Sequence, residues 1–456
     1  MTRLAFLAVL ALFLLVGLAA TWRRTDDHDH LTAAHELSPP LAALSAWSTT
    51  RSGFAFIGAV GFVASTGISA LWLSVGWIVG DVLAWATVMG PLATRARQLG
   101  THTTSALAGG AEAGPRWLAG VVTATLLSLY AAAQLTAGSK AASTVLELDP
   151  LHGLFLGAGL VAAYGITGGL RAAVWTDAVQ ALIMVMGMIA LAAGGLHHVG
   201  GAAALWAQLH EIDPSLTSPW PSASWGVVPW FLGWVAMGFG VIGQPHVGAR
   251  ALALRDPTRA RQVAAWSLGL SCMFTTCLTI VGLVARVTVP AIHTDPELAV
   301  PALATMVLPE VGTGLLLGAI FAATLSTADS QVLSVAGSLH HDLNLRLPVT
   351  WLTAGSIFAA LTLAAFAPSE VFLLVTIAWA LLASSLGPVI LWKSLRGGLS
   401  GMTAIWAMTL GAAAAMVWRF GLGWHTAMPE AIVGLSTGLS VCFAAHARHA
   451  TPRPNA

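Results

Sequence analysis

Charged side chains are scarce in this sequence. Asp, Glu, Lys and Arg make up only 9% of the 456 residues, whereas 57% are hydrophobic and the mean hydropathy is +0.79. A soluble domain carries about 25% charged residues, so this chain has too few to cover a water-exposed surface. The formal net charge of +1 also excludes the strongly basic balance that nucleic-acid partners favour. We therefore expect an integral membrane protein with the lipid bilayer as a partner and no nucleic-acid partner.

Cofactor and enzyme motifs are missing as well. The three cysteines lie in apolar segments without metal-type clustering, which is typical of small packing residues. No HExxH zinc motif, GxSxG nucleophile elbow or P-loop occurs. We therefore expect neither an enzyme nor a protein that carries a cofactor.

What the sequence does have is long apolar runs. Runs of about 20 residues match the length of a helix that crosses a bilayer, and a helix satisfies its backbone hydrogen bonds internally. The sequence therefore predicts an all-α membrane protein with about thirteen membrane-spanning helices. The predicted spans are 3–21, 44–73, 75–94, 117–138, 151–170, 175–195, 226–248, 264–287, 311–339, 351–367, 371–393, 400–418 and 429–446, and the span 311–339 is long enough to include a turn outside the membrane.

Basic residues predict the orientation of these spans. The segment 3–21 is interpreted as a retained helix, because Arg23 and Arg24 follow it. With the N-terminus outside, fifteen of the 20 Lys and Arg residues lie on the inner side, four lie on the outer side, and Arg51 lies within a span. The positive-inside rule favours this arrangement. We expect a protein of the cell (inner) membrane with a cytoplasmic C-terminal tail.

Two of the spans are interrupted by glycine, proline and hydroxyl residues. The second contains the run Ser48–Gly53, and the seventh contains the run Gly238–His246. Interrupted spans five helices apart are typical of the opening helices of two inverted five-helix repeats, whose unwound centres form a binding site at the membrane midplane. Unwound backbone offers carbonyl groups to a cation and N–H groups to a carboxylate.

Several longer runs resemble one known family. They are Asp26–Trp47, YGITGGLRAAVWTDAVQALIM (Tyr164–Met184), GFGVIGQPHVGARALALRD (Gly238–Asp256), AATLSTADSQVLSVAGSLHHDL (Ala322–Leu343), AWALLASSLGPVILW (Ala378–Trp392) and GGLSGM (Gly397–Met402). In this order they are similar to the sodium:solute symporter family, above all to its sodium/proline symporters. The resemblance implies a leucine-transporter-type fold and alternating access around a fixed site. It also implies a small-molecule substrate and sodium as the coupling ion.

The resemblance also implies a division of the chain. A peripheral first helix would occupy residues 1–22. The two inverted repeats would occupy 44–195 and 226–393, peripheral spans 400–446, and the cytoplasmic tail 447–456.

The resemblance implies a sodium site between the second and ninth spans. Its ligands would be the carbonyl of Ala323, the hydroxyls of Ser326 and Thr327, and carbonyls of Ser48 and Arg51. Oxygen ligands suit a small alkali cation, and hydroxyls and carbonyls provide them without a buried charge. The alternative interpretation is that the two hydroxyls bond back to the preceding helical turn.

Two departures from the family pattern lie in the second span. Thr50 stands where the family has an important aspartate, and Arg51 stands where an apolar residue is usual. An arginine at membrane depth is costly and permanently charged. Arg51 could be a fixed cation near the sodium site, which would make transport sodium-independent, proton-coupled or an exchange. It could instead pair with Asp81 or Asp329, or snorkel toward the cytoplasm. These two aspartates are also proton-coupling candidates.

The solute contacts are expected on spans 4 and 7. Met237 and Val241 occupy positions that are aromatic in the family, and Pro245 follows them. Tyr130 and Gln134 lie four residues apart on one helical face, so they either contact the solute or bond between helices.

A solute carboxylate is expected to meet the N–H groups of Ser52 and Gly53 at the break in span 2. The predicted function is uptake of a proline-like amino acid or a monocarboxylate by cation-coupled transport. The alternative from another class is a solute-sensing module with a separate signalling partner.

Overall fold

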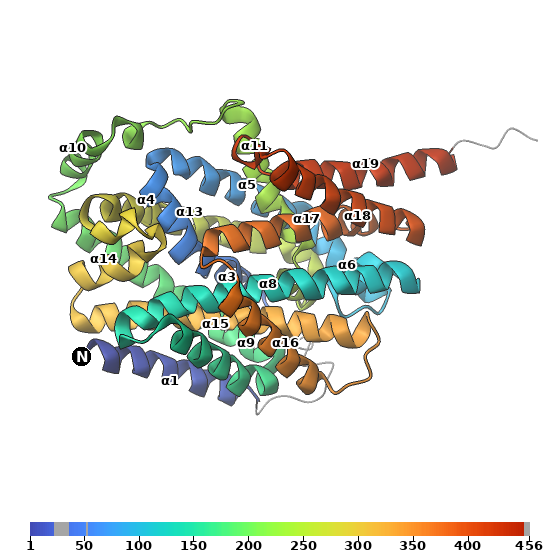
Figure 1. Cartoon of the computed structure of the whole chain (residues 1–456). Helices are drawn as coiled ribbons and strands as arrows, with labels where there is room; N and C mark the ends of the chain where they lie inside the picture. Colours follow the sequence, from blue (N-terminus) through green and yellow to red (C-terminus); the bar gives the residue numbers. More distant parts are fainter. Residues whose placement is uncertain (22–35, 52, 451–456) are drawn as a thin grey trace, which may run out of the picture.

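The computed structural model describes residues 1–21, 36–51 and 53–450, and these form a bundle of helices (Figure 1). Within this part of the chain there is no β-strand, only one isolated bridge between Leu37 and Leu254. The long helices are α1 (Thr2–Thr21), α5 (Leu71–Thr87), α8 (Ala113–Leu146), α9 (Pro150–His198), α11 (Val227–Phe239), α13 (Ala260–Thr288), α15 (Glu310–His341), α16 (Val349–Phe366), α17 (Val371–Leu395), α18 (Gly401–Met416) and α19 (Ala431–Ala450).

Shorter helices and turns connect them or complete a span. They are α3 (Pro39–Arg51), η2 (Phe54–Ala59), α4 (Val60–Thr66), α6 (Met89–Gln98), α7 (Thr104–Gly109), α10 (Ala202–Ile212), η5 (Gly240–Gly243), α12 (Pro245–Leu252), η6 (Pro257–Arg259), η8 (Pro296–Leu298) and α14 (Ala299–Val307).

Fewer helices than the sequence predicts are long and apolar enough to cross a membrane. Eight helices in the described residues could cross a membrane, or nine if the bent pair α11–η5 and α12 is one span. The other four predicted spans, 3–21, 44–73, 151–170 and 429–446, fall on shorter apolar helices. The count of thirteen is therefore not confirmed.

One local prediction about a helix boundary is wrong. The predicted turn within 311–339 does not exist, because α15 is one helix from Glu310 to His341 and its sequence contains no proline. At about 1.5 Å per residue this helix is longer than the hydrocarbon core, a mismatch that tilting can accommodate. The predicted spans 151–170 and 175–195 fall on the apolar segment Pro150–Ala163 and on the candidate span Ala173–His198, both within α9.

Both predicted interruptions coincide with changes in helix geometry. In the first, α3 ends at Arg51 and the π-helical turn η2 follows from Phe54. π-Helical turns are frequent at functional sites. In the second, η5 and α12 meet at a bend of 60°, and Pro245 begins α12 because it needs no N–H partner there.

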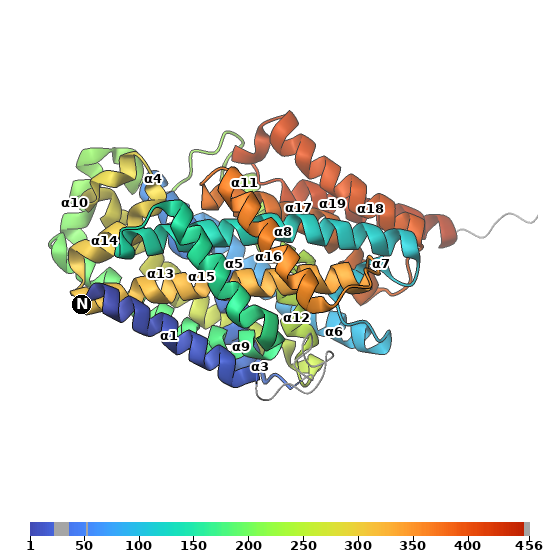
Figure 2. The ribbon, with the colours of Figure 1, turned by 60° about the horizontal axis from the view of Figure 1, so that its bottom comes forward.

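Close backbone packing holds the second broken span against α5. A Cβ atom added at Gly80 of α5 would overlap the carbonyl oxygen of Val235 in α11, and one added at Gly238 would overlap the carbonyl oxygen of Trp77. Small residues allow this approach between membrane helices. At the centre, α15 packs against α8, α9 and α3, and α1 lies along α15 and α9 (Figure 2).

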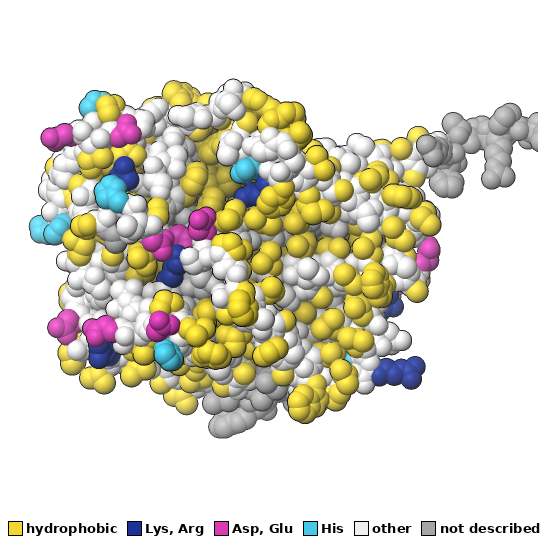
Figure 3. Space-filling view, in the orientation of Figure 1, with side chains coloured by type: hydrophobic (Ala, Val, Ile, Leu, Met, Phe, Trp, Pro, Cys, Tyr) yellow, Lys and Arg dark blue, Asp and Glu magenta, His cyan; other side chains and the backbone are white. Residues whose placement is uncertain are grey.

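The two ends of the bundle carry different elements. The N-terminus, α10 and α14 lie at one end, and α6 and the end of α19 lie at the other (Figure 1). Charged side chains lie mainly toward these ends on the face shown in Figure 3, and apolar side chains cover most of the surface between them. This distribution suits a protein with a central apolar band in the hydrocarbon of the bilayer.

Candidate ion and solute site

The predicted sodium ligands lie where the end of α3 meets the middle of α15. The Thr327 hydroxyl donates to the carbonyl oxygen of Thr49 at 3.4 Å, and the Ser326 hydroxyl donates to the carboxylate of Asp177. All of these side chains are buried. Both hydroxyls therefore point to other helices, whereas their neighbours Thr324 and Ser330 donate to carbonyls of the preceding turn.

The other predicted ligands flank this contact. Ala323 is buried one turn earlier on α15, where Gln180 donates to the carbonyl oxygen of Ala322 at 3.1 Å. The Ser48 hydroxyl donates to the sulfur of Met184 at 3.7 Å, so that side chain is directed to α9 rather than to α15.

An ion pair that the sequence analysis did not select lies beside Ser326. The carboxylate of Asp177 on α9 accepts from the guanidinium of Arg250 on α12 at 2.9 Å, and both side chains are 1% exposed. Asp177 also accepts from Ser45 at 2.6 Å and from Thr49 at 3.1 Å. The oxygen-rich site that we predicted without a buried charge therefore borders on a charged carboxylate.

Arg250 completes this network from the other side. It donates to the Ser45 hydroxyl at 3.1 Å, the Ser330 hydroxyl at 2.7 Å and the carbonyl oxygen of His246 at 2.6 Å. The Asp177–Arg250 network thus joins α3, α9, α12 and α15, which include parts of both broken spans. A buried charge pair is stable only when its remaining donors and acceptors are satisfied in this way.

Arg51 lies on a different side of α3 from Asp177. Its guanidinium donates to the Ser271 hydroxyl on α13 at 3.4 Å, and that hydroxyl also accepts from Trp47 at 3.1 Å. Asp81 on α5 is the carboxylate with which Arg51 interacts electrostatically, although no N–O distance within 4 Å joins them in the described residues. The side chain is 7% exposed, which argues against snorkelling.

The two other polar residues singled out near the ion site are also buried. The Thr50 hydroxyl donates to the carbonyl oxygen of Trp47 at 3.0 Å, one turn back on its own helix. Asp329 interacts with the charges of Asp177 and Arg250 rather than with Arg51. One of its carboxylate oxygens has no hydrogen-bond partner among the described residues.

The predicted solute contacts on α8 meet the first broken span. The N–H group of Gly53 donates to the side-chain oxygen of Gln134 at 3.1 Å. Tyr130 is buried one turn earlier, with its ring edge-on to His246 at 5.5 Å and to Trp379 at 6.1 Å between centroids. Ser52, the other predicted N–H donor, lies outside the described residues.

The second broken span contacts a tryptophan of α17 that the sequence analysis missed. The Trp379 indole of α17 donates to the carbonyl oxygen of Met237 at 2.7 Å, and Gln244 donates to the carbonyl oxygen of Trp379 at 3.0 Å. Val241 and Pro245 are buried in the same segment. Both nitrogens of the buried His246 ring have no hydrogen-bond partner in the part of the chain that the structure describes.

Aromatic rings and one ionic contact separate this region from a cavity at the α14 end. Phe372 of α17 stacks on Phe54 and Phe62, with centroids 5.5 Å and 5.0 Å apart. Beyond these rings lies a cavity of about 630 Å³. At its wall, Glu297 accepts from Lys140 at 2.7 Å and from the N–H groups of Val371 and Phe372, at the start of α17.

Comparison with known proteins places this arrangement in a family. The model of the sodium:solute symporter family matches residues 30–411. The chain belongs to the sodium:solute symporter family.

Curated relatives of this symporter-family chain are proline transporters. It is 28% identical to the high-affinity proline transporter PutP of Bacillus subtilis over 94% of each chain. The osmoregulated proline transporter OpuE of the same organism is 29% identical over 92% of this chain and 89% of its own length. The sodium/proline symporter of Escherichia coli is 26% identical over 94% of this chain and 90% of its own length.

Two solved structures share the fold. A Na⁺-coupled sialic acid symporter in a substrate-bound outward-open state has a TM-score of 0.78 at 15% identity, over 99% of this chain and 98% of its own. Mhp1, a nucleobase-cation-symport-1 family transporter, has a TM-score of 0.58 at 12% identity, over 91% of this chain and 94% of its own. The prediction of an all-helical fold of the leucine-transporter type is confirmed.

Membership of the sodium:solute symporter family identifies the general activity. The chain is an integral membrane transporter, not an enzyme, and it couples uptake of a small solute to a cation, with sodium as the coupling ion. The sequence predictions of family and activity are confirmed at this level. The site residues, the division into repeats and the orientation of the termini stay predictions.

Proposed function

We propose that this symporter takes up a proline-like amino acid or a related monocarboxylate, with sodium bound between the end of α3 and the middle of α15. The observation that carries the proposal is the bond from the Thr327 hydroxyl to the Thr49 carbonyl oxygen, next to Ser326, whose hydroxyl donates to the carboxylate of Asp177. Hard oxygen ligands suit an alkali cation. The buried carboxylate of Asp177 brings further oxygen atoms to this place, and its charge is offset by that of Arg250.

The solute would bind next to this ion, between the two broken spans. Its carboxylate would reach the N–H groups at the start of η2, where Gly53 already bonds to Gln134. Tyr130 and Trp379 would provide flat apolar walls for a ring or a short alkyl chain, with His246 as a further polar group between them. Trp379 would take the role of the aromatic residues that positions 237 and 241 lack.

Arg51 would act through Asp81. The pairing interpretation is favoured because these two charges interact, whereas no hydrogen bond joins the guanidinium to Ser326 or Thr327 among the described residues. A neutral Arg51–Asp81 pair would hold α3 to α5 and leave the cation site to sodium. If Arg51 instead replaces the ion, transport would proceed without sodium.

Orientation follows from charge. The end with α6 and the end of α19 would face the cytoplasm, and the N-terminus and α10 would face outward, because most Lys and Arg of the connecting segments belong to the α6 end in the predicted topology.

The test is uptake by purified protein in proteoliposomes. Labelled proline would be compared with other amino acids and monocarboxylates, each with an inward sodium gradient, an inward proton gradient and neither. We expect sodium-driven accumulation that Ser326→Ala with Thr327→Ala reduces at least tenfold, the loss of about 1.4 kcal/mol of ion binding. Ser334→Ala is the matched control, since this α15 hydroxyl bonds only to its own helix.

Other outcomes would redirect the assignment. Accumulation driven by protons, or exchange without a gradient, would favour Arg51 as a substitute for the ion. Binding of a solute without accumulation would favour the sensing module with a separate signalling partner. Equal uptake by the Ser326–Thr327 variant and the Ser334 control would remove sodium from this site.

A further inference from the structure

The short helix α7 lies at the α6 end of the bundle (Figure 2) and borders two cavities. One measures about 40 Å³ and lies between α7, α12 and α15, where its lining includes Arg250 and Ser330 of the Asp177–Arg250 network. The other measures about 280 Å³, and its lining includes the exposed Leu99. His102 and Thr103, directly before α7, line both cavities. The start of α7 is therefore the boundary between a cavity that reaches the buried ion pair and one that reaches the surface.

Hydroxyl and carboxylate groups hold the start of α7 against the end of α15. The Ser105 hydroxyl donates to the carboxylate of Asp342 at 2.6 Å and lies 2.8 Å from the Ser338 hydroxyl, which donates to the same carboxylate oxygen at 2.7 Å. All three residues are buried. The other carboxylate oxygen of Asp342 is 3.5 Å from the guanidinium of Arg116 on α8. Hydrogen bonds to a charged acceptor are stronger than those between neutral groups, so this contact attaches α7 firmly to α15.

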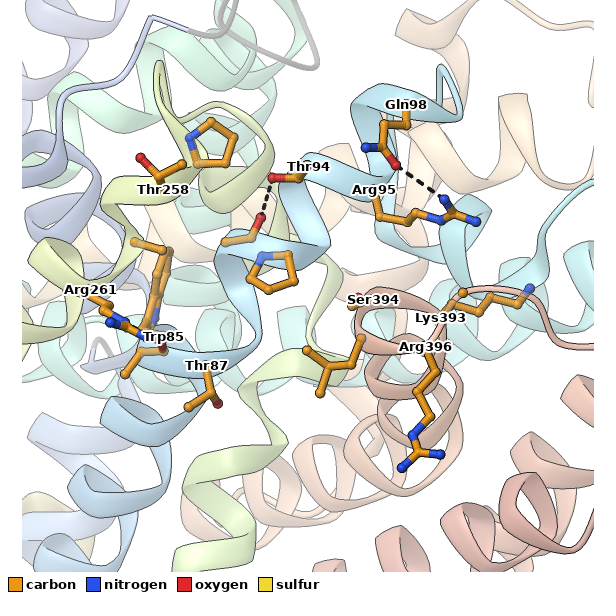
Figure 4. Close-up of a pocket in the computed structure, with 17 residues that line it drawn as sticks. Trp85, Thr87, Thr94, Arg95, Gln98, Thr258, Arg261, Lys393, Ser394 and Arg396 are labelled. Atoms are coloured by element: carbon orange, nitrogen blue, oxygen red, sulfur yellow. Dashed lines mark hydrogen bonds between the residues drawn. The ribbon is translucent and has the colours of Figure 1, made fainter. Parts of the chain in front are cut away.

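Two further contacts place α7 against α12 and α17. A Cβ atom added at Gly248 of α12 would overlap the side chain of Thr104, so the two helices touch two residues before Arg250. At the other end of α7, Lys393 of α17 donates to the carbonyl oxygen of Ala108 at 2.7 Å. Figure 4 shows this lysine directed away from a separate cavity of about 750 Å³ between α6, α13 and α17. α7 thus touches both the second broken span and the helix that carries the proposed ion ligands.

The connections on both sides of α7 contain a glycine in the left-handed region. Gly100 has a φ of 63° and Gly110 a φ of 74°, which residues with a side chain rarely adopt. The helix between them has only six residues. Positions at the ends of elements absorb the dihedral changes of a moving segment, and the larger cavity, which Gly110 and Ala106 line, leaves space next to α7. This arrangement suits a segment that moves as a unit.

We propose that α7 is the gate of this transporter at the α6 end, and that the bonds among Ser105, Ser338 and Asp342 hold it closed. When these bonds break, α7 moves toward the larger cavity and joins it to the smaller one, which opens a route from Arg250 and Ser330 to the surface. The contact lies outside the ion and solute site, so it controls release rather than binding. The proposal rests on the cation-coupled transport of the family and does not depend on which solute is carried.

The first test measures access to the smaller cavity in the full chain, purified in detergent, so that orientation in a membrane does not matter. The reporter is Leu333→Cys, a buried position that lines this cavity, in a background without the three native cysteines. The gate variant is Ser105→Ala. The matched control is Thr94→Ala, whose hydroxyl donates within α6 to the carbonyl oxygen of Gly90 at 3.1 Å.

We expect a thiol reagent to label Leu333→Cys about tenfold faster in the gate variant, the factor that one hydrogen bond to a charged group implies, and within about twofold of the starting rate in the control. A second reporter, Thr376→Cys at a buried position of α17, separates gate opening from unfolding, because Ser105→Ala should leave its labelling rate unchanged. Faster labelling at both positions, or unchanged labelling of Leu333→Cys, would overturn the proposal.

The second test locks the gate. The Ser105 and Ser338 oxygens are 2.8 Å apart, so Ser105→Cys with Ser338→Cys should form a disulfide with little movement. In proteoliposomes with an inward sodium gradient, the oxidised protein should take up labelled proline at least tenfold more slowly than the reduced protein.

The control for this lock is Ser400→Cys with Thr403→Cys, whose hydroxyls are also 2.8 Å apart but lie at the start of α18. Its oxidised and reduced forms should take up proline equally. Undiminished uptake by the cross-linked gate variant, or failure of its cross-link to form, would overturn the proposal. No proline uptake even in the reduced form would contradict the proposed solute, and the labelling rates, which need no solute, would still decide for or against the gate.

Discussion

At the scale of single residues, the Asp177–Arg250 pair is the most constrained feature of the bundle. Each side chain is 1% exposed. Besides the ion pair with each other, the two side chains form hydrogen bonds with Ser45, Thr49, Ser326 and Ser330. An ion pair of this kind costs desolvation energy. Its position beside the proposed cation site would let it hold the ion ligands in place.

Removal of one partner of this ion pair should therefore strongly destabilise the protein. Asp177→Asn leaves the Arg250 charge buried without its carboxylate, and we expect a loss of about 3–5 kcal/mol in stability. The measurement is the thermal unfolding midpoint in detergent, with sodium-driven uptake alongside. Glu147→Gln is the control, because its pair with Arg3 is exposed on both sides and surface pairs contribute little. Similar unfolding midpoints for the two variants would show that the Asp177–Arg250 pair is not needed for stability.

Arg51 offers a second residue-scale prediction. If it pairs with Asp81, then Arg51→Met leaves a buried carboxylate unpaired and should lower uptake at least tenfold. Arg51→Met with Asp81→Asn should recover a large part of that loss. The measurement is initial uptake across a sodium titration for the wild type, both single variants and the double variant. Sodium dependence that first appears in Arg51→Met would instead favour the fixed-cation interpretation.

At the scale of elements, the contact between η8 and α17 closes the region of Phe372. Glu297 accepts from Lys140 and from two N–H groups that start α17, where the positive end of the helix favours a carboxylate. This contact belongs to a different segment from the broken spans. We predict that it opens while the ion ligands stay in place.

Glu297→Gln should loosen this contact, because the neutral amide forms a weaker bond to Lys140 and keeps one acceptor at α17. We expect faster labelling of Thr376→Cys, a buried position one turn beyond Phe372 on α17, by a thiol reagent in a background without Cys272, Cys277 and Cys442. The comparison variant is Glu310→Gln, whose carboxylate pairs with the N-terminus on the exposed surface. Unchanged labelling in Glu297→Gln would show that the contact does not control access.

The sequence predicted the existence of the helices more accurately than their boundaries and contacts. The glycine and proline positions at 238–246 predicted a broken span because those residues alter helix geometry locally, whatever they pack against. The continuity of α15 was missed because length alone does not distinguish a turn from a tilted helix. Asp177 and Arg250 were missed because they are 73 positions apart, and only their packing makes them partners.

At the scale of the whole molecule, the family and the fold could be predicted because both depend on features distributed along the entire chain: low charge, recurrent apolar runs and ordered motifs. The route of the solute could not, because it depends on which helices move. The cavity of about 630 Å³ next to Lys140 and one of about 40 Å³ next to Pro245 and Ser330 flank the site on opposite sides. An alternating-access cycle requires that only one of these sides opens at a time.

Orientation in the membrane is the remaining whole-molecule prediction. Single cysteines at Ser215, between α10 and α11, and at Ser400, between α17 and α18, would be placed in a background without native cysteines. In intact cells an impermeant thiol reagent should label the first and not the second, and permeabilised cells should show labelling of both. The physical reason is that Lys and Arg resist translocation, and the connections near Ser400 carry Lys393 and Arg396, whereas residues 198–225 carry none. Labelling of Ser400→Cys in intact cells would show that the orientation is the opposite one.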